Sequence, residues 1–110
     1  MAFYALLGLI ETRRYDSEAG RFTNVFMAPP DQRECPLELT YNWGTESYDL
    51  GNAYGHIAIG VEDIYAVCEE LEKAGADVYR KPGPVLGGDT VIAFVRDPDG
   101  YAVELIECKE

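Results

Sequence analysis

Three side chains in this sequence could together hold a metal ion. His56 is the only histidine among the 110 residues, and it lies in the apolar, strand-like run 54–61. Glu38 and Glu104 each lie in a short apolar stretch, PLELTYN and YAVELIE, where an unpaired carboxylate is unfavourable or changes its pKa. Imidazole and carboxylate ligands in one site suit zinc, nickel, cobalt or manganese.

Strand periodicity assigns each of these side chains to a face. Successive residues of a strand point to opposite faces, so His56 shares a face with Ala58 and Gly60, which leave room beside an imidazole. Glu104 shares its face with Ala102. A common metal ion would explain why these polar groups point inward. The same residues could instead be a hydrogen-bonded core histidine and solvent-facing glutamates, and periodicity leaves both interpretations open.

The second half of the chain predicts the element order β-α-β-β-β. A strand at 54–61 precedes a helix at 63–74, whose apolar residues recur at helical spacing and which ends before Gly75. Asp63 is placed to cap the start of this helix. Strands are predicted at 76–80, 90–96 and 101–107, and the sequence DPDG between the last two is typical of a type I turn.

The first half of the chain is a partial copy of this pattern. It predicts the end of a helix at 2–8 and strands at 9–15, 21–28 and 37–41. The closing segments FMAPPDQRECPLELTY and FVRDPDGYAVELIE place Glu38 and Glu104 at matching positions. His56 and Glu104 are 48 residues apart (104 − 56 = 48), and the same count back from Glu38 reaches position −10.

The predicted fold class is therefore α+β, with tandem βαβββ modules and a first module truncated at its N-terminus. We expect one domain, 1–110, with an incomplete module at 1–46 and a complete module at 53–110. The net charge of −11 disfavours binding to nucleic acid or to an anionic membrane surface. No apolar run is long enough to span a bilayer, and three cysteines without CxxC spacing favour a reducing, cytoplasmic compartment.

Three motifs resemble those of the glyoxalase I (lactoylglutathione lyase) family, within the vicinal-oxygen-chelate superfamily. They are LELTYNWG at 37–44, YGHIAIGV at 54–61 and GPVLGGDTVIAFVRDPDGYAVELIE at 83–107. The resemblance covers nearly the whole chain, from about position 3 to position 107. It implies paired βαβββ modules and a homodimer in which both subunits build each active site. It also implies an enzyme that isomerises the hemithioacetal of methylglyoxal and glutathione to S-lactoylglutathione.

The resemblance also implies roles for individual residues. Glu38, His56 and Glu104 match metal ligands, and Glu104 matches the catalytic proton shuttle. Asn42 matches a position that binds the glutamyl end of glutathione, and Arg80 matches a basic position near the glycyl carboxylate. One divalent ion is implied per site. The short loops favour Ni²⁺ or Co²⁺, with Zn²⁺ possible, and the loop 81–88 is expected to cover the substrate.

One family ligand has no counterpart in this sequence. The family's fourth ligand is a histidine on the first strand of the first module, which the repeat count places before Met1. The sequence therefore predicts either a glyoxalase I, with full or reduced activity, or a non-catalytic module of the same fold that binds a small molecule or is completed by a partner. A ring-cleaving dioxygenase is disfavoured, because its iron site uses two histidines and this chain has one.

Overall fold

The computed structural model describes residues 1–108, which form two compact units that divide between Tyr48 and Asp49. Each unit combines one helix with one β-sheet, which confirms the predicted α+β class. The division lies within the interval 47–52 that separates the two predicted modules. That the two units make one functional domain stays a prediction.

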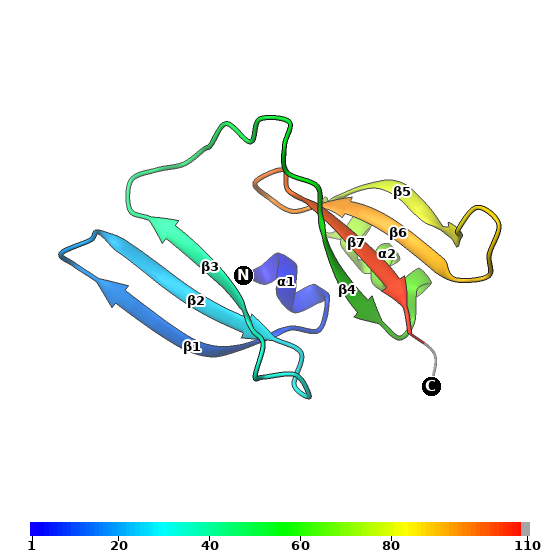
Figure 1. Ribbon diagram of the computed structural model, residues 1–110, viewed down its shortest axis with the longest axis horizontal. Helices are drawn as coiled ribbons and strands as arrows, with labels where there is room; N and C mark the ends of the chain where they lie inside the picture. Colours follow the sequence, from blue (N-terminus) through cyan, green and yellow to red (C-terminus); the bar gives the residue numbers. More distant parts are fainter. Residues whose placement is uncertain (109–110) are drawn as a thin grey trace. The chain divides into compact units, whose positions relative to one another are not determined.

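The first unit is a helix followed by an antiparallel sheet. Helix α1 (Ala2–Leu6) precedes strands β1 (Ile10–Ser17), β2 (Phe22–Ala28) and β3 (Leu37–Asn42), which are adjacent in that order (Figure 1). Val25 and Met27, which alternate along β2, are buried on one face of the sheet. This face is on the same side as the apolar side chains of the α1 segment. This core consists of Phe3, Tyr4, Leu7, Leu9, Val25, Met27 and Ala28.

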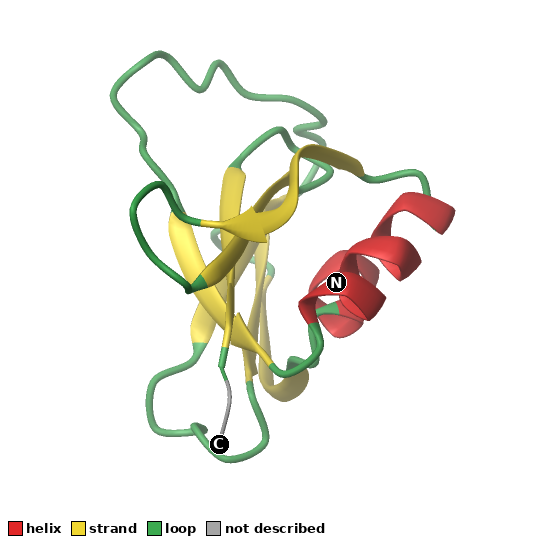
Figure 2. Ribbon diagram, turned by 90° about the vertical axis from the view of Figure 1, so that its right-hand side faces the viewer, coloured by secondary structure: helices red, strands yellow, loops and turns green. Residues whose placement is uncertain are grey.

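The second unit has the predicted order β-α-β-β-β. Its elements are β4 (Ile57–Val61), α2 (Ile64–Lys73), β5 (Asp77–Pro84), β6 (Val91–Arg96) and β7 (Ala102–Glu107). The sheet order is β4-β7-β6-β5, with β4 parallel to β7 and the other pairs antiparallel (Figure 1). Helix α2 lies along one side of these strands (Figure 2).

The helix-facing side of this sheet contains the core of the second unit. Val103 and Leu105 of β7 are fully buried, as are Ile64 and Leu71 of α2. Because side chains alternate along a strand, this burial directs Glu104 to the opposite face, which α2 does not cover. The predicted face of Glu104 is thus confirmed.

The ends of α2 and the turn before β7 follow the sequence signals. The Asp63 carboxylate accepts a hydrogen bond from the Ala66 N–H at 3.1 Å, which confirms the predicted N-cap. Gly75 has a φ of +88°, a left-handed conformation that favours glycine after a helix. In DPDG, the Gly100 N–H donates to the Asp97 carbonyl at 2.9 Å, as in a four-residue turn.

Two predicted boundaries in the second unit are wrong. Strand β4 begins at Ile57 rather than at position 54. Ile57 pairs with Val103 near the start of β7, and residues before Ile57 have no strand to pair with because the chain before β7 is still in a turn. Strand β5 continues to Pro84, so the first half of the predicted loop 81–88 is strand. In the described part of the chain, neither helix is long and apolar enough to cross a membrane.

The three cysteines differ in accessibility, which predicts a difference in reactivity. Cys68 is 2% exposed on α2, and burial raises the pKa of its thiol, whereas Cys35 and Cys108 are exposed. Alkylation needs an accessible thiolate. We expect iodoacetamide to modify Cys35 and Cys108 rapidly in the folded protein and Cys68 only after urea denaturation, as measured by peptide mass spectrometry. Equal rates at all three thiols in the folded protein would contradict this packing of α2.

Candidate metal and substrate site

His56 and Glu104 meet on the face of the second sheet that α2 leaves uncovered. The distance from His56 Nε2 to Glu104 Oε1 is 3.1 Å. Glu104 lies in the middle of β7, and His56 immediately precedes β4, the parallel neighbour of β7. Pairing of Ala58 with Glu104 brings the histidine, two residues earlier on the same face, beside the carboxylate. The structure therefore brings together two of the three predicted metal ligands.

Phe94 forms the apolar wall of this pair, and sequence reasoning missed it. Phe94 is directly opposite Glu104 on β6, and its ring lies edge-on to the His56 imidazole, with centroids 5.2 Å apart. The Glu104 side chain is 17% exposed and the His56 side chain 42%, so the carboxylate is largely enclosed and the imidazole is open. The position of Phe94 opposite Glu104 in the predicted hairpin is the sequence signal that could have identified it.

The spacing of the pair fits two adjacent ligands of one ion. With bonds of about 2.1 Å, ligand atoms at right angles around an ion are about 3.0 Å apart. The observed separation of 3.1 Å between His56 and Glu104 matches this value. Among residues 1–108, no three histidine, cysteine or acidic side chains gather into a complete site. The donor set therefore fits part of a metal site.

Glu38 and Asn42 lie in the first unit. Both are exposed residues of β3, and they share the face opposite to the less exposed Leu37 and Leu39. The Asn42 side-chain amide donates to the Tyr48 hydroxyl at 2.8 Å, which orients the amide. The ligand role of Glu38 and the substrate-binding role of Asn42 stay predictions.

The Arg80 guanidinium is bonded to main-chain carbonyls. Its Nη1 group donates to Gly83 and Ile92 at 2.9 Å each and to Lys81 at 3.2 Å, and its Nη2 group donates to Pro84 at 3.1 Å. Three of these carbonyls belong to β5 itself, and the bond to Ile92 connects β5 to β6. The predicted contact between Arg80 and a substrate carboxylate stays a prediction, and this second, architectural role was not visible in the sequence.

A tyrosine lies just before His56 in the chain. The ring of Tyr54 packs edge-on against Tyr101, with centroids 4.9 Å apart. Burial and, to a smaller extent, the nearby Asp97 raise the pKa of the Tyr54 hydroxyl. Tyr54 is therefore a neutral hydrogen-bond donor at this end of the sheet at neutral pH.

Comparisons with known proteins give a consistent result. Residues 1–105 match the family model described as the Glyoxalase/Bleomycin resistance protein/Dioxygenase superfamily. The chain is 48% identical to a lactoylglutathione lyase of Salmonella typhimurium, covering 100% of this chain and 83% of the relative, and 50% identical to a probable lactoylglutathione lyase of Synechocystis, covering 97% and 83%. Glyoxalase I from Zea mays is a structural match, with 40% identity and a TM-score of 0.87. It aligns with 98% of this chain, which spans only 39% of the maize chain.

The carbonyl contacts of Arg80 predict a loss of stability when the guanidinium is removed. Arg80→Met should lower the free energy of unfolding by about 2 kcal/mol, because hydrogen bonds of a charged donor to partly buried carbonyls are lost. Urea denaturation followed by circular dichroism measures this. The matched control is Arg33→Met, since Arg33 bonds only the Pro30 carbonyl in an exposed loop. Equal stability of both variants and the unsubstituted protein would contradict the architectural role of Arg80.

Proposed function

This chain belongs to the glyoxalase/bleomycin resistance protein/dioxygenase superfamily, and on that premise we propose that it is a metal-dependent lactoylglutathione lyase. The proposal rests on one combined observation. This chain is 48% identical to such a lyase over 100% of its own length. It also holds His56 and Glu104 3.1 Å apart on an open sheet face. The substrate is the hemithioacetal of methylglyoxal and glutathione, and the product is S-lactoylglutathione, so the reaction removes methylglyoxal.

Glu38, His56 and Glu104 are the proposed ligands of one divalent ion per site. Ni²⁺ or Co²⁺ is favoured and Zn²⁺ is a possible alternative, because all three accept imidazole and carboxylate ligands. The bound ion supplies a Lewis acid that makes negative charge on the substrate oxygens less costly. Glu38 belongs to the first unit, so binding requires that the first unit of this chain or of a second copy supply that carboxylate. We propose a homodimer with shared sites.

Glu104 is the proposed proton shuttle. Its carboxylate removes the proton from the hydroxyl-bearing carbon of the hemithioacetal and returns it to the neighbouring carbon, while the hydroxyl proton passes to the oxygen of that neighbouring carbon. One carboxylate can serve as base and then as acid because the isomerisation leaves the total number of protons unchanged. The enclosed position of Glu104 beside Phe94 limits proton exchange with water.

Asn42 and Arg80 are the proposed contacts to glutathione. The Asn42 amide nitrogen donates to Tyr48, so its carbonyl oxygen can accept from the ammonium of the glutamyl end. All four bonds of Arg80 come from its two terminal nitrogens. Within the described chain this leaves the Nε–H of Arg80 to donate to the glycyl carboxylate.

The protein is proposed to act in the cytoplasm, since Cys35, Cys68 and Cys108 are all free thiols. The alternative function, a non-catalytic module that binds a small molecule or is completed by a partner, is motivated by the single histidine of the sequence, His56. Activity of the purified homo-oligomer distinguishes the two functions.

The central test of the enzyme is the variant Glu104→Gln. We expect nickel-loaded protein to form S-lactoylglutathione, measured by ultraviolet absorbance, and Glu104→Gln to lower kcat at least about 1,000-fold, because an amide cannot accept the proton. The matched control is Glu107→Gln in the same strand, which should keep kcat within about twofold because Glu107 points to the opposite face of β7 from Glu104.

Two results would contradict the proposal. Absence of turnover in the nickel- or cobalt-loaded unsubstituted protein would favour the non-catalytic module. Equal turnover by Glu104→Gln and Glu107→Gln would remove Glu104 from the proton-transfer role.

A further inference from the structure

A row of three side chains, Arg80, Phe94 and Glu104, crosses the second sheet. Phe94 on β6 is directly opposite Arg80 on one side and Glu104 on the other. A register shift between Val78 and Arg80 leaves Tyr79 as an extra residue of β5. Such a bulge changes which side chains point to a given face. Here it places Arg80 directly opposite Phe94 on the face of Glu104. The ring of the extra residue, Tyr79, also contacts Phe94, with centroids 5.9 Å apart.

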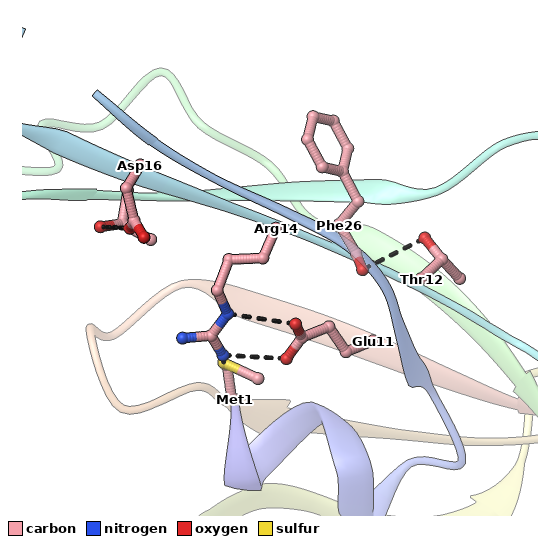
Figure 3. A network of polar contacts seen from close by, with 7 residues as sticks. Met1, Glu11, Thr12, Arg14, Asp16 and Phe26 are labelled. Carbon is pink, nitrogen blue, oxygen red and sulfur yellow. Dashed lines mark hydrogen bonds and ion pairs between the residues drawn. The ribbon is translucent and has the colours of Figure 1, made fainter.

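The first sheet contains the same row, formed by Arg13, Phe26 and Glu38. Phe26 on β2 is directly opposite Arg13 of β1 and Glu38 of β3. A register shift between Glu11 and Arg13 leaves Thr12 as the extra residue. The Thr12 hydroxyl donates to the Phe26 carbonyl at 3.3 Å and so fastens the bulge to β2 (Figure 3). The arginine, the phenylalanine, the glutamate and the bulge therefore all recur in the internal repeat.

The bulge in β1 separates two adjacent arginines. Arg14 points to the α1 side of the sheet, and its Nη2 and Nε groups donate to the Glu11 carboxylate at 2.9 and 3.1 Å (Figure 3). This pairing raises the pKa of Arg14 and lowers that of Glu11. Arg13 lies over the Phe26 ring, with its guanidinium carbon 5.3 Å from the centroid. The ring of Phe26 and the Arg14–Glu11 pair lie on opposite sides of the sheet (Figure 3).

The two arginines of the repeated row differ in how their donors are used. The Arg80 guanidinium donates to four main-chain carbonyls. Arg13 is exposed, and within residues 1–108 its guanidinium makes no hydrogen bond or ion pair. The Phe26 ring lies beside the guanidinium, and the edge of the guanidinium, which carries its N–H groups, has no acceptor among residues 1–108. This edge is suited to a bidentate pair with a carboxylate.

The row also gives Arg13 a defined distance from Glu38. Neighbouring strands are about 4.8 Å apart, so two strand spacings separate these residues by about 10 Å. An extended peptide of three residues has about this length. A tripeptide thiol that reacts at an ion held by Glu38 can therefore extend across Phe26 to Arg13.

We propose that Arg13 binds a carboxylate of the thiol substrate and makes the enzyme selective for thiols that carry this charge. The inference rests on the proposed function for the identity of the substrate. Its physical basis is the open guanidinium edge on the same face as Glu38. Because the chain has a net charge of −11, a thiol with two carboxylates and one ammonium, whose net charge is negative, is repelled overall and needs a local cation of this kind.

The test compares Arg13→Met with Arg14→Met in the nickel-loaded protein. We expect Arg13→Met to raise KM for the glutathione hemithioacetal about tenfold with kcat within about twofold, because a charge-assisted hydrogen bond far from the reacting carbons contributes equally to the ground state and the transition state. Arg14→Met is the matched control, since Arg14 lies on the other face, and it should leave KM within about twofold. Arg13→Lys should recover part of the loss, because it retains the charge without the bidentate geometry.

A second substrate separates charge recognition from a structural effect. With the hemithioacetal of glutathione diethyl ester, which has no carboxylate, Arg13→Met and the unsubstituted protein should have equal KM values within about twofold. A KM increase that persists with the diester would show a structural effect and overturn the proposal. An unchanged KM for the glutathione substrate in Arg13→Met would also overturn it.

Direct binding distinguishes failure of this inference from failure of the proposed function. S-methylglutathione, titrated into each nickel-loaded protein by calorimetry, should bind Arg13→Met about tenfold more weakly than Arg14→Met. This result without any turnover would support the role of Arg13 and contradict the lyase activity. Equal affinities, or no binding to the unsubstituted protein, would overturn the role of Arg13 whatever the turnover.

Discussion

Burial of alternate β7 residues against α2 is the constraint on which the candidate site depends. Val103 and Leu105 are fully buried on the helix side. A shift of the strand by one residue would expose both, at about 1.5–3 kcal/mol for each side chain. Glu104, between them, is therefore held on the open face. Parallel pairing of β4 with β7 then brings His56 to within 3.1 Å of its carboxylate.

Much of this arrangement could be predicted from the sequence, because periodic patterns determine which residues are buried. The stripe on α2, the β-α-β-β-β order and the face of Glu104 all follow from apolar spacing. The start of β4 could not be predicted, because it depends on where β7 begins and can form hydrogen bonds with β4. The carbonyl contacts of Arg80 were also invisible, since they depend on the path of the chain beyond the bulge.

The bulges at Thr12 and Tyr79 show a second limit of sequence patterns. One extra residue changes the face to which the following side chains point, but it leaves no distinct mark on hydrophobicity in strands that are as exposed as β1 and β5. Strict alternation from Glu11 would have placed Arg13 on the helix side. The internal repeat compensates for this limit, because the same row of arginine, phenylalanine and glutamate occurs in both sheets. In an acidic chain, each row places an arginine on the same face as an acidic site residue, two strands away.

The most direct test of the account is anomalous X-ray diffraction from crystals of the nickel-loaded protein. We expect one strong nickel peak per site, within bonding distance of His56 Nε2 and a Glu104 carboxylate oxygen, with a Glu38 carboxylate from the same or a second copy as the third protein ligand. A nickel peak at which His56 and Glu104 are not both ligands would contradict the central claim. So would crystals of protein exposed to excess nickel in which this pair keeps its direct contact and binds no metal.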